Sequence, residues 1–171
     1  MKLSVIVEGH GEEAAVRFLV QRVATELLGL NLWTLPHTMR VNRGTMVKRP
    51  EELGRYLQLA NDKIEGAGAI LLLLDADDDC PAVLGPKLLA TVQALRPDLK
   101  ISVVLANREE VIRDAKGWIK RERGNYSPTV DQASLTTKFD LAMARDRADS
   151  SDKSCREVQI LLEIHRHDAI E

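Results

Sequence analysis

Short apolar runs alternate with helix-spaced apolar positions along the first 123 residues of the chain. The runs predict strands, and apolar positions recurring every three or four residues predict the helices between them. Strands are expected at Leu3–Val7, at Asn31–Val41, at Ile70–Leu74 and at Lys100–Leu105. The second should lie near a sheet edge, because Pro36 is poorly tolerated in a central strand. This alternation is typical of an α/β fold with a doubly wound, mostly parallel sheet of about four strands.

Helices are predicted between and after these strands. They are expected at residues 12–28, from Pro50, at 88–95 after a loop with Pro81 and Gly85-Pro86, and at 111–119. Two more, around 133–147 and 153–165, should cover a face or an edge of the sheet, with Leu135, Phe139 and Met143 facing inward. We expect a single domain over residues 1–171, with its core in 1–123 and a helical cover in 124–171.

Composition and charge narrow the classes of function. Hydrophobic residues make up 44% and charged residues 29% of the chain, which excludes disordered, collagen-like and coiled-coil proteins. A formal net charge of −2 argues against coating nucleic acid through bulk positive charge, so any such contact must be local. Cys80 and Cys155 lack a C-x-x-C partner and are expected to be free thiols. Without a signal-like or membrane-length apolar run, the chain is expected to be cytoplasmic.

Carboxylates follow the most apolar strand directly. Five apolar residues end in Asp75-Ala76-Asp77-Asp78-Asp79, and ligands of open α/β sheets bind at the carboxyl ends of the strands. Residues two apart on an extended chain point the same way, so Asp75 and Asp77 could aim at one point. Glu8 follows the first strand and would join them if the two strands are neighbours. So many carboxylates predict a bound cation, and oxygen ligands select Mg²⁺ or Mn²⁺.

A basic segment follows the second strand. Arg40, Arg43, Lys48 and Arg49 have no acid between them, so this segment, expected as a loop, could bind phosphates. A solvated loop explains the same pattern, and both readings stay open. Lys116 could approach a phosphate from a later helix, although a lysine on a polar helix face needs no function.

The two acidic motifs together resemble the Toprim domain of topoisomerases, primases and related nucleases. The resemblance rests on Val7-Glu8-Gly9-His10-Gly11-Glu12 and on Asp75-Ala76-Asp77. A closer resemblance, to a bacterial Toprim-like family of unknown function often encoded beside ATP-binding-cassette type ATPases, spans most of the chain. It is carried by residues 5–13, 74–80, 106–109, 115–118, 126–129 and 131–132. It implies that Glu8 is the general acid or base and that Asp75 and Asp77 bind the metal, with Asp79 and Glu109 as further candidates.

Two functions remain after these observations. The resemblance implies a Mg²⁺- or Mn²⁺-dependent phosphodiester-cleaving nuclease of a bacterial defence or DNA-processing system. The positive charges make Arg40, Arg43, Lys48 and Lys116 the candidate substrate-binding residues. The alternative is a non-catalytic partner subunit of an ATPase, favoured by the low net charge and a short segment after Glu109. A phosphate-acceptor receiver domain fits less well, because only Glu8 follows the first strand. Whether the substrate is DNA, RNA or a nucleotide, and whether the protein is an oligomer, stays open.

Overall fold

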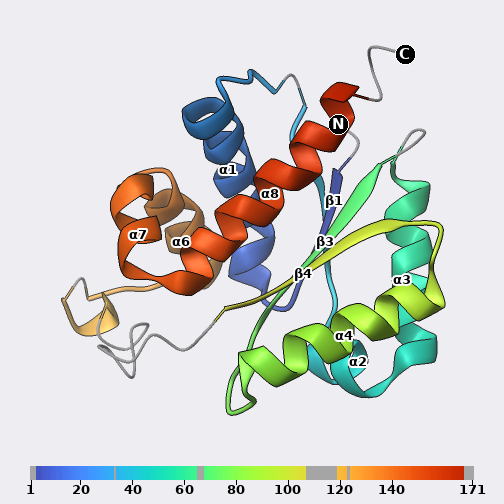
Figure 1. The fold of residues 1–171 in the computed structure, drawn as a ribbon. Coiled ribbons are helices and arrows are strands. Elements are labelled where there is room, and N and C mark those ends of the chain that lie inside the picture. Colours follow the sequence, from blue (N-terminus) through green and yellow to red (C-terminus); the bar gives the residue numbers. More distant parts are fainter. Residues whose placement is uncertain (1–2, 33, 65–67, 107–118, 123, 168–171) are drawn as a thin grey trace.

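A computed structural model describes residues 3–32, 34–64, 68–106, 119–122 and 124–167. At its centre is a four-stranded, all-parallel sheet in the order β2-β1-β3-β4 (Figure 1). The strands are β1 (Leu3–Val7), β2 (His37–Arg40), β3 (Ala69–Asp75) and β4 (Lys100–Ala106). The helices are α1 (His10–Arg22), continued by a π-helical turn η1 (Val23–Leu27), α2 (Arg43–Lys48), α3 (Pro50–Asp62), α4 (Pro81–Leu95), α6 (Pro128–Thr136), α7 (Leu141–Arg147) and α8 (Asp149–His167). The predicted doubly wound α/β fold with C-terminal helices is confirmed.

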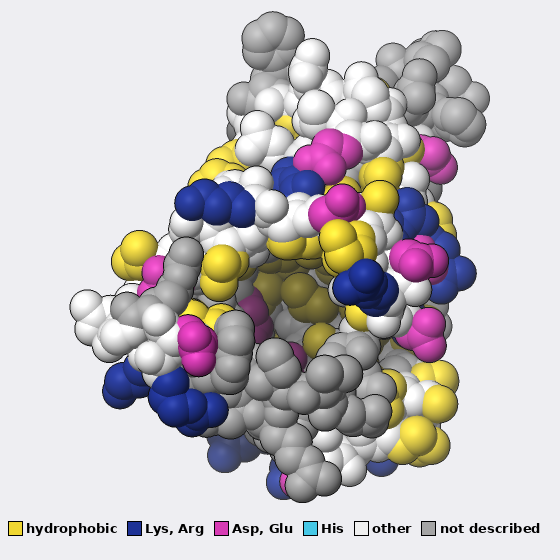
Figure 2. All heavy atoms as spheres, turned by 90° about the vertical axis from the view of Figure 1, so that its left-hand side faces the viewer, with side chains coloured by type: hydrophobic (Ala, Val, Ile, Leu, Met, Phe, Trp, Pro, Cys, Tyr) yellow, Lys and Arg dark blue, Asp and Glu magenta, His cyan; other side chains and the backbone are white. Residues whose placement is uncertain are grey.

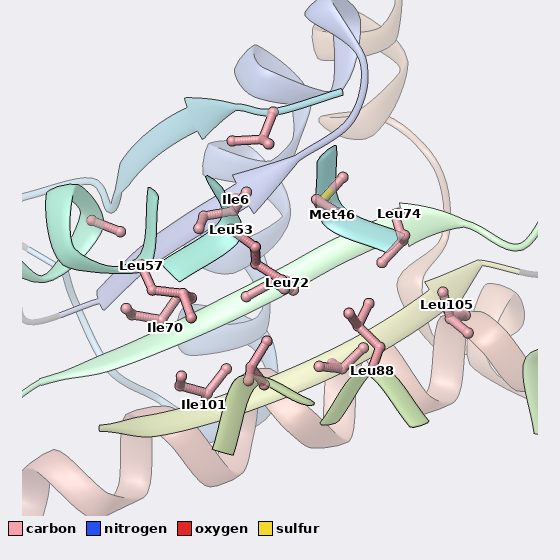
Figure 3. Packing of buried hydrophobic residues seen from close by; sticks show 14 of the residues in the cluster. Ile6, Met46, Leu53, Leu57, Ile70, Leu72, Leu74, Leu88, Ile101 and Leu105 are labelled. Carbon is pink, nitrogen blue, oxygen red and sulfur yellow. The ribbon is translucent and has the colours of Figure 1, made fainter. Parts of the chain in front are cut away.

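Helices cover both faces of the sheet and give it two apolar cores. Alternate residues of a strand point to opposite faces, so Ile6 and Leu72 pack with α2, α3 and α4, while Val5 and Leu71 pack with α1, α7 and α8. Figure 3 shows the first of these cores, with Leu53 and Leu88 facing the sheet side chains. β1 and β3 are buried on both faces, as near-continuous apolar strands of a parallel sheet are.

The helix boundaries differ from the sequence prediction in two places before β4. Residues 43–48, expected as loop, form α2, because the side chain of Asn42 caps the helix by accepting a hydrogen bond from the Thr45 amide at 2.9 Å. The predicted loop around Gly85-Pro86 is also wrong, because α4 already begins at Pro81, where a proline suits the first turn. At Gly85 the helix lies close to the sheet: an added Cβ would be 3.5 Å from Leu105 Cδ1.

The C-terminal part contains three described helices where two were expected. Asp140 ends the first segment and caps α7, since its carboxylate accepts from the Met143 amide at 2.8 Å. The break exposes Phe139 and Met143, which were wrongly predicted to face inward. Val158, Leu161 and Leu162 of α8 are buried against the sheet, as the periodicity predicted. None of the helices in the described ranges combines the length and the apolar character needed to cross a lipid bilayer.

Candidate functional site

The two strands that end in acid are neighbours in the sheet. β1 and β3 pair in parallel with Val7 opposite Leu73, so their carboxyl ends lie at the same edge. Glu8 follows β1 directly, and Asp75 is the last residue of β3. The condition for Glu8 to lie beside Asp75, that their strands are neighbours, is therefore met. This edge is where ligands of open parallel sheets bind.

Glu8 is the most electrostatically constrained carboxylate at this edge. Its Oε2 atom is buried and receives no hydrogen bond from the described part of the chain. Burial raises the pKa of the Glu8 carboxyl above its usual 4.5, and the nearby charges of Asp77 and Asp75 raise it further. Arg43 acts in the opposite direction but is the weakest of these influences. A buried acceptor without a partner next to other carboxylates favours either a proton or a cation at that oxygen.

The turn between β1 and α1 is stabilised by hydrogen bonds to the Glu12 side chain and from the Arg40 side chain. The Gly9 amide donates to Glu12 Oε2 at 2.9 Å, which satisfies one of the free amides at the start of α1. Arg40, at the end of β2, donates from Nε to the backbone carbonyl of Glu8 at 3.0 Å. Arg40 thus lies beside Glu8.

The acidic segment after β3 is a turn and not an extension of the strand. The Asp79 amide donates to the Ala76 carbonyl at 3.0 Å, and Asp77 has a positive φ of 50°. The extended conformation from which a common direction of Asp75 and Asp77 was predicted therefore ends before Asp77, because a turn spans Ala76 to Asp79. Both still lie close enough to Glu8 to raise its pKa.

Arg43, the first residue of α2, donates hydrogen bonds to this turn. Its Nε atom donates to Asp77 Oδ2 at 3.0 Å, and its Nη2 atom donates to the Ala76 carbonyl at 2.9 Å and to Asp79 Oδ2 at 2.5 Å. The Arg43 side chain is only 17% exposed, whereas those of Asp77 and Asp79 are 46% and 58% exposed. The structure therefore brings together Glu8, Asp75, Asp77, Asp79, Arg40 and Arg43.

Other predicted site residues are less closely tied to this edge. Lys48 is exposed in the last turn of α2, five positions after Arg43. Glu109 and Lys116 lie outside the described residues. Within the described ranges, no three His, Cys, Asp or Glu side chains are arranged so that they could hold a metal ion. Asp77 and Asp79 pair with Arg43 in this arrangement.

Sequence reasoning missed two features of the site. It predicted Arg43 as a phosphate contact but not as a partner of the acidic turn; the Asn42-x-x-Thr45 cap could have placed Arg43 on a helix, yet not against Asp77. It also named Glu12 only as part of the motif, although Glu12 binds the Gly9 amide and raises the pKa of Glu8.

Comparison with protein-family models, curated proteins and solved structures gave no significant match. The Toprim resemblance therefore stays a prediction from the motifs, and the function has to be argued from the geometry of the site.

Proposed function

We propose that this protein is a divalent-metal-dependent enzyme that cleaves phosphodiester bonds of nucleic acid, with its active site at the edge formed by β1 and β3. The observation that carries the proposal is the buried Oε2 of Glu8, which has no hydrogen-bond partner among the described residues and lies beside Asp75 and Asp77. Such an oxygen supports a role in holding a proton or a cation, and both are needed when a phosphodiester is hydrolysed.

The chemistry of the donor set fits Mg²⁺ or Mn²⁺. Glu8, Asp75 and Asp77 would hold the ion through carboxylate oxygens, which hard divalent cations prefer. Asp77 is paired with Arg43, so it would have to exchange that partner for the ion. When bound, the cation supplies the positive charge that allows an anionic phosphodiester to approach several carboxylates.

The protein's own residues provide the remaining functions. Glu8, with a pKa raised by burial and by its acidic neighbours, is suited to take up and return a proton at a higher pH than an ordinary glutamate. Arg40 beside the Glu8 carbonyl and Arg43 beside Asp77 offer planar, charged donors to phosphate oxygens. Arg43 becomes available for this role once a cation takes its place on Asp77.

Thermal unfolding with and without Mn²⁺ tests the metal site first. A ligand at a hundredfold excess over its dissociation constant adds about 2.7 kcal/mol, which for a chain of this size raises the melting temperature by roughly 5 to 10 °C. We expect this shift in the wild type and its loss in Asp75→Asn. Asp78→Asn removes the same charge from an exposed position of the same turn and should keep the shift.

Cleavage of single- and double-stranded DNA and RNA then tests the reaction. The wild type and Asp78→Asn should cleave at least one of them with Mg²⁺ or Mn²⁺, whereas Asp75→Asn and Glu8→Gln should not. Cleavage by Asp75→Asn at the wild-type rate would contradict the assignment. A wild type with neither a metal-dependent shift nor cleavage would overturn it and favour the non-catalytic ATPase subunit.

A further inference from the structure

An apolar pocket of about 530 Å³ lies between α1 and the segment that runs from Ile119 through α6. Its walls include Ala15 of α1, Leu135 and Gln132 of α6, and the rings of Tyr126 and Phe139. Figure 2 looks onto the side of the molecule that carries α6 and α7, and shows a hollow with hydrophobic side chains on its floor and acidic side chains in view. A volume of this size is typical of pockets that bind small molecules.

The α1 and α6 walls of this pocket are closely packed at one end. At Gly11 an added Cβ would lie 1.6 Å from Gln132 Oε1 and 2.5 Å from the Pro128 carbonyl oxygen, so only glycine permits this approach of α6. The pocket therefore owes its shape to direct backbone contact between the two helices.

An arginine holds the other end of α6. Arg22 donates from Nη1 to the carbonyls of Thr136 and Phe139 at 2.9 and 2.8 Å, and its guanidinium carbon lies 4.8 Å from the centre of the Phe139 ring. Glu26 pairs with the same guanidinium at 2.6 Å. Phe139 is thus positioned before any ligand arrives, which lowers the ordering cost of binding against it.

The pocket continues towards the acidic edge of the sheet. A smaller apolar cavity beside it is lined by Glu12 and Leu73 and shares Ala15, Thr136 and Phe139 with it. Leu73 lies two residues before Asp75 on β3, so both belong to the same face of that strand. Glu12 also binds the Gly9 amide next to Glu8. An apolar pocket and the proposed phosphodiester site therefore adjoin each other.

We propose that this pocket binds a nucleobase whose phosphate lies at the Glu8–Asp75 edge, so that the substrate is a nucleotide unit of a single or locally opened strand. This inference rests on the proposed function. A base is a planar apolar ring that stacks on aromatic side chains such as Tyr126 and Phe139, and it presents polar edges that the Gln132 amide can meet as donor or acceptor. A duplex cannot place a base there without unstacking it.

Isothermal titration of the full-length protein with three probes tests the pocket. The probes are dAMP and 2-deoxyribose 5-phosphate, each with Mn²⁺, and 2′-deoxyadenosine without metal. We expect dAMP to bind about tenfold more tightly than the sugar phosphate, which lacks the base. The metal-free nucleoside should bind weakly but measurably, because it needs the pocket alone.

A larger side chain that fills the pocket should remove the contribution of the base to nucleotide affinity. Ala15→Leu places a larger side chain between the two cavities without harming helix α1, since leucine is a good helix former. It should lower dAMP affinity about tenfold, abolish nucleoside binding and leave the sugar phosphate unchanged. Ala14→Leu makes the same change one position earlier, on a different side of the helix, and should alter none of the three. Tyr126→Leu, outside the regular helices, is the second variant if Ala15→Leu does not fold.

The outcomes separate this inference from the proposed function. Equal affinity for dAMP and the sugar phosphate, absence of nucleoside binding to the wild type, or an unchanged affinity of Ala15→Leu for dAMP would overturn the base pocket. Nucleoside binding that Ala15→Leu abolishes, in a protein that shows no Mn²⁺ shift, would support the pocket and contradict the metal site alone.

Discussion

Arg43 donates from its Nε atom to Asp77 Oδ2 at 3.0 Å, and this ion pair joins the start of α2 to the acidic turn after β3. The same guanidinium reaches Asp79 and the Ala76 carbonyl. A positive charge therefore already occupies part of the carboxylate cluster in which we place the cation. Arginine and a divalent ion compete for Asp77, and the outcome of that competition sets the metal affinity.

Arg43→Gln is expected to strengthen Mn²⁺ binding several-fold while weakening substrate binding and cleavage, because the variant removes both a competing charge and a phosphate contact. Isothermal titration with Mn²⁺ measures the first effect, and cleavage kinetics measure the second. Lys48→Gln is the matched control for Mn²⁺ binding, since it removes one exposed charge from the same helix. Weaker Mn²⁺ binding by Arg43→Gln would show that the arginine orders the turn for the ion and does not compete with it.

Glu8 predicts an unusual dependence of stability on pH. Its folded-state pKa is raised above the usual 4.5, chiefly by burial and then by Asp77 and Asp75. Its contribution to stability is therefore complete below about pH 4.5 and is lost as the pH rises through the raised value. Without divalent metal, Glu8→Gln should melt at a higher temperature than the wild type at pH 8, and the difference should vanish near pH 4. Melting curves between pH 4 and 8 measure it.

Asp78→Asn controls for net charge in that experiment, because it removes one carboxylate from an exposed position of the neighbouring turn. Mg²⁺ should narrow the difference at pH 8, since the cation compensates the Glu8 charge in the wild type and the variant lacks that ligand. A difference of equal size at both ends of the pH range would mean that burial of the Glu8 charge is not its cause.

The sequence was sufficient for the parallel sheet, and it placed Glu8 beside Asp75 on the condition that β1 and β3 are neighbours. Near-continuous apolar runs can only be buried on both faces, and alternation with helices makes their sheet parallel, so their carboxyl ends share an edge. It was not sufficient for the turn at Ala76 or for the Arg43–Asp77 pair. These depend on where α2 lies relative to β3, and the spacing of apolar residues carries no information about a contact between residues 34 positions apart.

The C-terminal segment shows the same limit. Apolar spacing suggested one helix across residues 133–147, but the Asp140 cap and the break before it divide the segment. Phe139 lines a pocket and not a core because the helix ends before Asp140 and because Arg22, 117 positions earlier in the chain, binds the Phe139 carbonyl. Local pattern predicts which segments are helical more readily than it predicts which side of each is covered.

Two glycine substitutions in helices should have opposite effects on stability. Gly11→Ala would place a Cβ 2.5 Å from the Pro128 carbonyl oxygen, so α6 must move and the protein should lose roughly 1 to 3 kcal/mol. Gly54→Ala in α3 has only Leu95 Cδ2 nearby, at 3.8 Å, and should gain about 0.5 to 1 kcal/mol from helix propensity. Urea unfolding measures both. A Gly11→Ala variant as stable as the wild type would contradict the close packing of α1 on α6.

Arg22 is expected to stabilise α6 far more than an ordinary surface arginine stabilises its helix. Its side chain is 17% exposed and donates to the carbonyl of Thr136, the last residue of α6, and to that of Phe139 just after it, whereas Arg156, 62% exposed, pairs with Asp152 of its own helix α8. Arg22→Met should cost about 1 to 3 kcal/mol, because it removes the donor to the part-buried Thr136 carbonyl and to the exposed Phe139 carbonyl. Arg156→Met should cost less than about 0.5 kcal/mol.

Hydrogen exchange localises the effect of Arg22. In Arg22→Met the amides of α6 should exchange faster while those of β1 and β3 keep their protection, because the contacts removed lie at Thr136 and Phe139 and not in the sheet. In Arg156→Met neither region should change. Uniformly faster exchange across the sheet in Arg22→Met would mean that α6 unfolds only together with the rest of the protein. Faster exchange confined to α6 would instead show that α6 can detach from α1 while the sheet stays folded. Nucleotide binding in the pocket between them would then slow the exchange of the α6 amides.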